Sequence, residues 1–473
     1  MGNGWRHKPG DKIIRPHRIR RYRLKKVLGV TAVFSAGYGS VSSSIYFALG
    51  IVALAAVGAT PVALGIAGIL FIFTALTYAE GTSMLPEAGG SASFAMRGFN
   101  RPIGFITGWA LILSYIATIA IAAFTIPPYL GFFWEPFKSS PMIGTATAIG
   151  IIFLLMIINV IGIRETSIIN IGAAILDIAT QITLIVIGLI VLYNPPLLLQ
   201  RIVENWPSFQ NVILGIAIAS IAYTGIETAS HMAEETRVAE KRVPRAIVLM
   251  IFAVLAVFAG ISLVSFLAMT PQELATVWVR DPVAGIAANI PVQILSDILR
   301  PLISILAATI LLIATNTALI GVSRLVFSMG QRRLIPNIFS RVHHSFQTPY
   351  LAIIFFSLFG IIILIPGFFT PDVYKNVGAI YAFGSLLAFT LSHAAILSLR
   401  IREPETPRPF KLHGNIKIRG YFLPVTAILG MIFTAGIWVA ILITQPYSRW
   451  VGITWMAIGL ILYFIFVRRS RAG

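Results

Sequence analysis

Gly37-Tyr38-Gly39-Ser40-Val41-Ser42-Ser43-Ser44 lies in the middle of an apolar stretch that runs from Leu28 to Val57. A second apolar stretch, Val212 to Met232, is interrupted in its middle by Ala222-Tyr223-Thr224-Gly225-Ile226-Glu227-Thr228. Glycine and hydroxyl residues weaken the hydrogen-bond ladder of a membrane helix, and non-helical backbone at mid-depth persists only where protein or a wet cavity covers it. Two interruptions at matching places in the two halves of a chain indicate a binding site shared by both halves.

The composition is that of an integral membrane protein. Of the 473 residues, 57% are hydrophobic and only 11% are charged, whereas soluble domains contain about 25% charged residues. Apolar segments recur along nearly the whole length, which leaves no room for a sizeable soluble domain. The chain has no cysteine, so disulfides, zinc–thiolate sites and thiol catalysis are excluded.

The net charge of +19 follows membrane topology. Most Lys and Arg lie in the two terminal tails and in alternate loops, and this alternation is the positive-inside pattern. It predicts both termini in the cytoplasm of a plasma-membrane protein and argues against a nucleic-acid partner. The six basic residues on the other side are Lys138, Arg201, Arg280, Arg300, Lys375 and Arg449.

Twelve apolar segments are long enough to cross a bilayer, which takes about 20 apolar residues. They are Leu28–Val57, Val62–Met84, Ile103–Leu130, Ile143–Ile163, Ile169–Tyr193, Val212–Met232, Ala246–Ala268, Leu302–Met329, Leu351–Ile365, Val377–Leu399, Tyr421–Ile443 and Val451–Val467.

These segments predict an all-α membrane protein with three parts. Residues 1–26 form a basic tail, residues 27–420 a transport core, and residues 421–473 two accessory spans and a second basic tail. Within the core, spans 1–5 (about 28–193) and 6–10 (about 212–399) would form two inverted repeats with an interrupted first span in each. The outer loop after span 7 contains Pro271-Gln272-Glu273-Leu274, which indicates a short surface helix.

The first interruption suits a carboxylate ligand. If the helix unwinds at Ser40 to Ser43, a new half-helix begins there and offers free backbone N–H groups and its positive dipole end. The candidate residues are Gly39, Ser40, Ser42, Ser43 and Ser44. The alternative is that these small residues only pack against a neighbouring helix.

The second interruption contains Glu227, and a carboxylate at mid-membrane is a candidate functional group. It would face a substrate ammonium group, carry a proton or hydrogen-bond another span. Freed carbonyl groups near Ala222 and Gly225 would also accept from an ammonium group, and Tyr223 would line or gate the pocket. A purely structural hydrogen bond from Glu227 remains the alternative.

Asp177 is a further carboxylate within an apolar span. It needs a cation, a proton or a hydrogen-bonding partner, and Thr315, Asn316 and Thr317 of span 8 offer oxygen atoms that suit a hard cation such as Na⁺. A protonatable Asp177 would instead couple transport to H⁺, and a plain interhelical hydrogen bond is the third alternative. No metal site is assigned firmly.

Four stretches resemble the amino acid–polyamine–organocation superfamily of permeases. The first is the glycine-rich stretch from Ala36 to Tyr46, and the second is Tyr78-Ala79-Glu80 with Leu85-Pro86-Glu87-Ala88-Gly89-Gly90-Ser91. The third combines Ala222–Glu227, Ala233-Glu234-Glu235-Thr236 and Val243-Pro244-Arg245-Ala246. The fourth is Gly321 to Met329 with Leu334-Ile335-Pro336 and Thr348-Pro349-Tyr350.

This resemblance implies a five-plus-five inverted-repeat transporter with two extra helices, an amino acid or amine substrate, and substrate contacts through both interruptions. Two departures affect those expectations. Ser42-Ser43-Ser44 stands where the family usually has glycine–small–glycine, so the pocket would be narrower. Asp177 stands where some proton-coupled members carry lysine, so the role of that lysine does not transfer.

We therefore expect a secondary transporter that works by alternating access, coupled to H⁺ or Na⁺, without a cofactor and without enzymatic activity. The alternatives are an ion transporter or channel, or a sensor on the same scaffold. A channel would be indicated by a selectivity-filter repeat or a ring of carboxylates, and an enzyme by paired His and Asp motifs at the membrane face; the sequence contains neither pattern. It indicates no oligomeric state.

Overall fold

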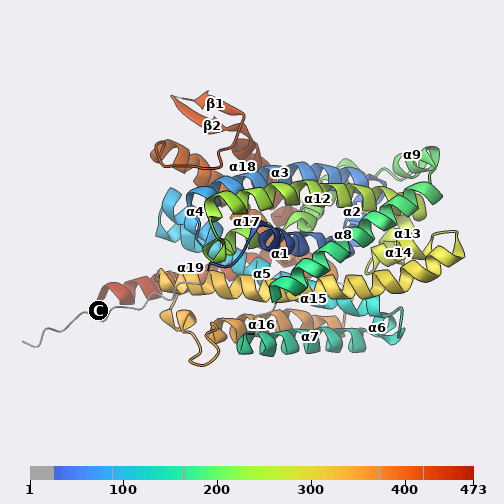
Figure 1. Cartoon of the computed structure of the whole chain (residues 1–473), viewed down its shortest axis with the longest axis horizontal. Helices are drawn as coiled ribbons and strands as arrows, with labels where there is room; N and C mark the ends of the chain where they lie inside the picture. Colours follow the sequence, from blue (N-terminus) through green and yellow to red (C-terminus); the bar gives the residue numbers. More distant parts are fainter. Residues whose placement is uncertain (1–25, 88, 163–165, 371–372, 419, 473) are drawn as a thin grey trace, which may run out of the picture.

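The structure is a computed structural model that describes residues 26–472, apart from residues 88, 163–165, 371–372 and 419. Nearly all of the predicted basic tail, residues 1–25, and the turn at 163–165 therefore lie outside the described residues. The described chain folds into a bundle of long helices that run along a common direction (Figure 1).

The long helices carry the apolar segments. They are α1 (Val30–Ser42), α2 (Ile45–Ala56), α3 (Thr60–Met84), α5 (Arg101–Leu130), α7 (Pro141–Ile161), α8 (Thr166–Val191), α10 (Phe209–Ala219), α12 (Ala239–Ala268), α15 (Gln293–Gln331), α16 (Tyr350–Leu364), α17 (Val373–Arg402), α18 (Val425–Thr444) and α19 (Pro446–Ala472).

Shorter elements join them. They are η1 (Val57–Ala59), α4 (Gly90–Gly98), α6 (Pro136–Ser139), α9 (Pro195–Glu204), η2 (Ser220–Tyr223), α11 (Glu227–His231), η3 (Ala233–Glu235), α13 (Pro271–Thr276), α14 (Pro282–Ala288), η4 (Asn337–Ser340), η5 (Ile365–Phe368) and the antiparallel strands β1 (Asn415–Ile418) and β2 (Tyr421–Pro424).

Eleven stretches of the described chain are long and apolar enough to cross a membrane. The first, Val30–Met84, has 55 residues and contains both α1–α2 and α3, which the sequence divides into two predicted spans. The other ten each contain one predicted span. The chain is therefore a multi-pass membrane protein.

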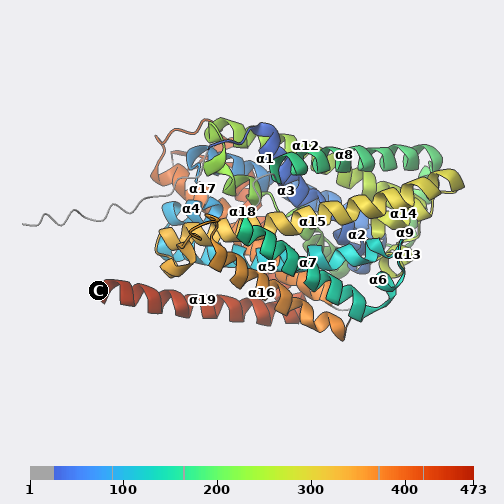
Figure 2. The ribbon, with the colours of Figure 1, turned by 60° about the horizontal axis from the view of Figure 1, so that its bottom comes forward.

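The two ends of the bundle differ in their loops. Figures 1 and 2 show α4 and the end of α19 at one end, and α6, α9, α13 and α14 at the other. We name the first the basic end, because the loops there contain most of the described Lys and Arg, including those of residues 234–245 and 400–418. The second is the opposite end. The predicted surface helix there is α13, whose N-terminus has a capping box between Thr270 and Glu273.

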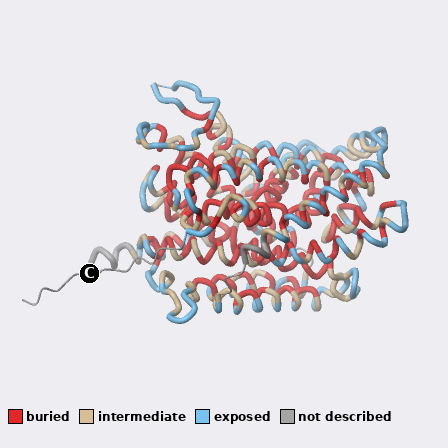
Figure 3. The backbone as a smooth tube through the Cα atoms, in the orientation of Figure 1, coloured by how far each residue is buried: buried red, intermediate tan, exposed pale blue. Residues whose placement is uncertain are grey.

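The core runs along α5. Buried residues gather in the middle of the bundle, while the hairpin of β1 and β2 is largely exposed (Figure 3). From Leu111 to Ile126 every residue of α5 is buried, and this segment alternates Ala, Thr and Ser with Ile. Such small residues let neighbouring helices approach closely, which explains why α5 packs against both α15 and α17.

The structure corrects two predicted boundaries. The segment predicted to begin span 11 at Tyr421 is strand β2, which pairs with β1 as a hairpin, and α18 begins at Val425. The helix of span 7 begins at Ala239 and not at Ala246. The predicted span was bounded by its apolar residues, so it omits the first turns of the helix, which contain charged residues outside the apolar segment.

The first interruption is also narrower than expected. The expected unwinding at Ser40–Ser43 is absent: α1 continues to Ser42, and only Ser43 and Ser44 separate it from α2, both with right-handed helical backbone. The Ser44 amide donates to Val41, three residues back, and the Ser43 hydroxyl donates to the Ser40 carbonyl at 3.2 Å. The serine side chain satisfies the carbonyl that loses its usual donor, so the helix tightens instead of opening.

Candidate binding site between the interrupted helices

The second interruption is a real break in the helix. After η2 ends at Tyr223, Thr224 adopts an extended conformation and Gly225 has φ +109°, before α11 resumes at Glu227. Only glycine adopts that backbone conformation without strain. The sequence therefore places its one permissive residue at the point where the chain must turn.

Gly225 lies directly against α1. A Cβ atom at this position would come within 2.7 Å of the Ser40 Oγ and 3.0 Å of the Ser40 backbone carbonyl group. From the next helical turn, the Thr228 hydroxyl donates to Ser40 Oγ at 3.3 Å. The two interruptions predicted from the sequence thus meet through Ser40 and Gly225, and Ser40 is fully within α1.

Glu227 is buried, with 1% of its surface exposed. Its Oε2 accepts from the Gly225 amide at 3.0 Å, so the carboxylate folds back over the break. Among the described residues no Lys, Arg or His forms an ion pair with it. A buried carboxylate is costly without a cation or a proton, so this arrangement suits a cationic ligand or a protonated side chain.

Three buried tyrosines that the sequence analysis did not propose as site residues lie in the region of this carboxylate. Tyr78 of α3, Tyr115 of α5 and Tyr381 of α17 all lie within electrostatic range of Glu227. The Tyr115 hydroxyl is buried and has no hydrogen-bond partner among the described residues. Tyrosine normally gathers at the membrane interface, so the position of Tyr115 in the middle of the segment Ile103–Leu130 was an available sequence signal.

The remaining residues predicted for the second interruption point elsewhere. Tyr223 donates to the Leu64 carbonyl of α3 at 2.9 Å, and its ring packs between Phe71 and Phe258. Ala222 is fully buried beside it in η2. Tyr223 therefore braces the break against α3.

The serines of the first interruption divide between two tasks. Ser43 stabilises the turn, and Ser44 precedes α2, where its carbonyl accepts from Ala48 at 2.7 Å. Ser42 instead donates its hydroxyl to Asp177 at 3.2 Å. Gly39 faces α15, where a Cβ atom would approach Ile310 at 3.6 Å.

Asp177 connects α8 to both halves of the first interrupted span. Its carboxylate accepts from Tyr38 at 3.1 Å and Ser42 at 3.2 Å, both on α1, and from Tyr46 of α2 at 2.7 Å. Gln181, one turn along α8, donates at 2.7 Å. Four neutral donors satisfy this buried carboxylate without a cation from the protein.

The span 8 residues predicted to share an ion site with Asp177 are not among its hydrogen-bond partners. Asn316 pairs with Asn159 of α7 at 2.6 Å, and the Thr315 hydroxyl donates to the Leu311 carbonyl. The Thr317 hydroxyl is buried without a hydrogen-bond partner in the described part of the chain. Of the three, Thr317 has the oxygen atom that is free for a ligand.

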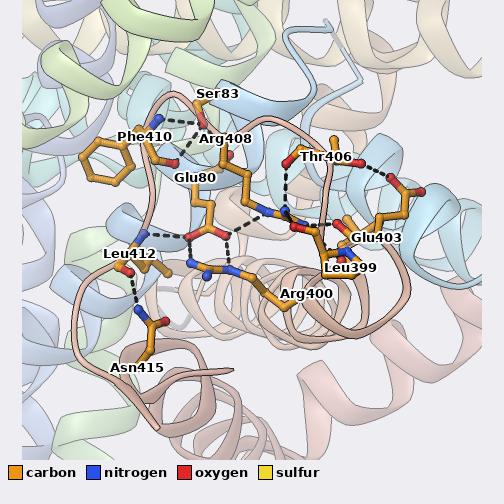
Figure 4. A network of polar contacts seen from close by, with 11 residues as sticks. Glu80, Ser83, Leu399, Arg400, Glu403, Thr406, Arg408, Phe410, Leu412 and Asn415 are labelled. Carbon is orange, nitrogen blue, oxygen red and sulfur yellow. Dashed lines mark hydrogen bonds and ion pairs between the residues drawn. The ribbon is translucent and has the colours of Figure 1, made fainter. Parts of the chain in front are cut away.

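A third buried carboxylate, Glu80 of α3, was quoted only as part of a motif. Arg400 of α17 donates to both of its oxygens at 2.6 Å, and the Leu412 amide donates at 2.8 Å (Figure 4). Arg408 lies 3.5 Å from Oε1 and donates to the carbonyls of Pro404 and Thr406 in the same loop. Glu80 therefore holds the loop after α17 against α3 at the basic end.

Ion pairs also join helices at both ends of the bundle. At the basic end, Glu235 of η3 pairs with Arg324 of α15 at 2.8 Å, and its carbonyl accepts from the Leu28 amide at the start of the first span. At the opposite end, Lys138 pairs with Asp281 at 2.7 Å. Burial raises the pKa of Asp281 above its ordinary range, against the opposing effect of Lys138.

Comparison with known proteins agrees with this architecture. A family model described as amino acid permease matches residues 28–467. The branched-chain amino acid permease BcaP of Bacillus subtilis is 26% identical over 94% of each chain, and the methylthioribose transporter of the same organism is 26% identical over 94% of this chain and 92% of its own. The low-affinity putrescine importer PlaP of Escherichia coli is 27% identical over 95% of both.

Proposed function

The chain belongs to the amino acid permease family, and on that basis we propose that it is a secondary active transporter of an amino acid or a related amine, working by alternating access. The relatives named above transport an amino acid, an amine and a thio-sugar, so the family alone leaves the substrate open. The site chemistry narrows that choice.

In the proposed topology the chain crosses the plasma membrane twelve times, with its basic end in the cytoplasm. Residues 27–420 form two inverted repeats of five spans, and residues 421–473 add two accessory spans. The 55-residue stretch Val30–Met84 supports this count, because about 20 residues are enough for one crossing.

One observation carries the proposal: the break at Gly225 is pressed against Ser40 and is covered by the buried Glu227 carboxylate. Glu227 and the three tyrosines would receive the ammonium group of the substrate, since aromatic faces and a carboxylate both attract a cation. Ser42, Ser43 and Ser44 would face the carboxylate of an amino acid in a state where the junction of α1 and α2 opens, because the Ser43 and Ser44 amides here donate to Gly39 and Val41.

We further propose that Asp177 couples transport to H⁺ or Na⁺. Its hydrogen bonds reach both α1 and α2, so a change of charge at Asp177 acts on the first interruption directly. Thr317 offers an unpartnered hydroxyl on the facing span.

A thermal-shift screen tests the proposed substrate class. The purified protein is heated with each of the twenty amino acids, putrescine, other common amines, and methylthioribose as an amine-free ligand. A ligand at 100 times its dissociation constant stabilises the folded state by about 2.7 kcal/mol, so a substrate raises the melting temperature. We expect the ligands that do so to carry an amino group, and Glu227→Gln to abolish the shift.

The matched control is Glu204→Gln, which removes an exposed carboxylate on α9. It should respond to ligands as the wild type does. A shift by methylthioribose alone, or an undiminished amine shift in Glu227→Gln, would contradict the assigned role of Glu227.

A further inference from the structure

A groove of about 630 Å³ opens at the basic end of the bundle, and neither interruption contributes a residue to its lining. It lies between the start of α1, the first turns of α12 and the loop after α17. Val30, Leu249 and Phe410 form its apolar lining, and Lys241 and Arg245 form its cationic rim. We call this the Lys241 groove.

The two cations are unpaired. Both side chains are exposed, and neither forms an ion pair with any residue that the structure describes. Glu240 also lines the groove, so one carboxylate and two cations face it and their net charge is +1. The rim therefore presents net positive charge to a ligand.

The cations continue into an apolar stripe. Lys241, Arg245, Leu249 and Phe252 follow one another along a single side of α12, and Leu249 and Phe252 are 52% and 70% exposed. At about 1.5 Å per residue, Phe252 lies about 10 Å below Arg245. Cations above and exposed apolar side chains below match the two parts of a phospholipid.

We propose that the Lys241 groove binds an anionic phospholipid, with its phosphate on Lys241 and Arg245 and its acyl chains along Leu249 and Phe252. Basic pockets between spans at a cytoplasmic face are suited to anionic headgroups, and long basic side chains reach up to that level. The site is separate from the proposed substrate site.

Charge argues against the chain's own amino terminus as the occupant. Residues 1–26 precede Val30 in the sequence and include ten Lys and Arg, which the cations of the groove would repel. The same tail is attracted to an anionic membrane surface, so tail and groove favour the same lipid.

A labelling experiment on the full-length protein tests this site. Because the natural chain has no cysteine, Phe252→Cys gives a unique position for a fluorophore in nanodiscs of phosphatidylcholine. Spin-labelled phosphatidylglycerol should quench this fluorophore at a lower mole fraction than spin-labelled phosphatidylcholine does. At Ile432 of α18, which is 55% exposed and outside the groove, the two lipids should quench equally after Ile432→Cys labelling.

The double substitution Lys241→Gln and Arg245→Gln should reduce the preference for phosphatidylglycerol about 30-fold, which corresponds to about 1 kcal/mol for each cation. The control Arg341→Gln with Lys417→Gln removes two charges from the same end outside the groove, and should keep the preference. Equal quenching by both lipids at Phe252→Cys would overturn the proposal, as would an unchanged preference in the groove variant. If the groove variant fails to fold, the comparison of the two lipids at Phe252→Cys with Lys241 and Arg245 intact still tests the proposal.

Discussion

At the scale of single residues, the backbone conformation at Gly225 and the contact with Ser40 leave no room for a side chain. Gly225→Ala places a methyl group within 2.7 Å of Ser40 Oγ and forces φ +109° on a residue with a side chain. We expect a loss of stability of about 1–3 kcal/mol and a loss of transport, measured by chemical unfolding in detergent and by uptake.

Gly436→Ala is the matched control, because nothing lies within 4 Å of its Cβ position in α18. Removing the Ser40 hydroxyl should not rescue Gly225→Ala, since the Ser40 backbone remains 3.0 Å away and the φ angle is unchanged. Full recovery of Gly225→Ala by Ser40→Ala would show that only the side-chain contact matters.

The ion pair between Glu80 and Arg400 is the second position with a large expected effect. Removing one partner of a buried pair leaves an uncompensated charge and costs about 3–5 kcal/mol. Arg400→Gln should fall near the lower end, because Arg408 remains 3.5 Å from the carboxylate. Chemical unfolding of Arg400→Gln in detergent measures this loss.

Arg97→Gln breaks an exposed ion pair with Glu403 in the same region and is the control for Arg400→Gln. Exposed pairs contribute at most about 1 kcal/mol. Equal losses of stability in the two variants would show that the Glu80 pair does not anchor the loop.

The pair of Arg97 and Glu403 has a predictable pH dependence. Hydrogen bonding from Arg97 holds the pKa of Glu403 below its ordinary range. A lowered folded-state pKa stabilises the fold above the unfolded value of about 4.3 and loses that contribution as the pH falls through the folded-state value. The melting temperature of Glu403→Gln should therefore lie below wild type at pH 7 and approach it below pH 4. A gap that widens on acidification would contradict this sign.

At the scale of elements, Asp177 joins α8 to α1 and α2, and Asp177→Asn separates its two proposed roles. If Asp177 carries H⁺ or binds Na⁺, the variant should lose gradient-driven accumulation of substrate while exchange of labelled substrate persists, because exchange needs no net ion movement. Imposing pH and Na⁺ gradients separately on proteoliposomes shows which ion is involved.

An Asn side chain keeps much of the hydrogen bonding to Tyr46 and Ser42. A helix-to-helix contact alone would therefore survive the substitution. Gradient-driven accumulation equal to wild type in Asp177→Asn would end the coupling proposal.

The sequence predicted the helical elements well where apolar runs are long and uninterrupted. It located the second break from Gly225 and Glu227, because a permissive glycine and a carboxylate within an apolar stretch are local signals. It misjudged the first break, where the structure depends on whether the Ser43 hydroxyl replaces one backbone donor. A continuing helix and an unwound helix differ here by a single hydrogen bond, and the amino-acid composition does not predict which of the two forms.

Contacts between segments that are far apart in the chain could not be predicted from the sequence. Glu80 and Arg400 are 320 residues apart, and nothing local to either indicates the partner. The same holds for Tyr115, which reaches the site because α5 occupies the centre of the bundle. Strands β1 and β2 were missed because their apolar residues, such as Phe422, extend the hydropathy of the following helix.

At the scale of the whole molecule, different ion pairs join the helices at the two ends of the bundle. The basic end combines the pair of Glu235 and Arg324 with the Glu80 cluster, and the opposite end has the pair of Lys138 and Asp281. The proposed alternating access would require these contacts to open in turn around the Gly225 break. The central claim is thus that a substrate crosses the membrane through that break.

Uptake into proteoliposomes tests the claim most directly. Radiolabelled ligands from the thermal-shift screen are offered under an imposed ion gradient to the wild type, Glu227→Gln and Glu204→Gln. The account predicts that at least one amine-bearing ligand accumulates above its external concentration with the wild type and Glu204→Gln, and that accumulation disappears with Glu227→Gln. A bound ligand that never crosses the membrane, or accumulation that Glu227→Gln leaves unchanged, would contradict it.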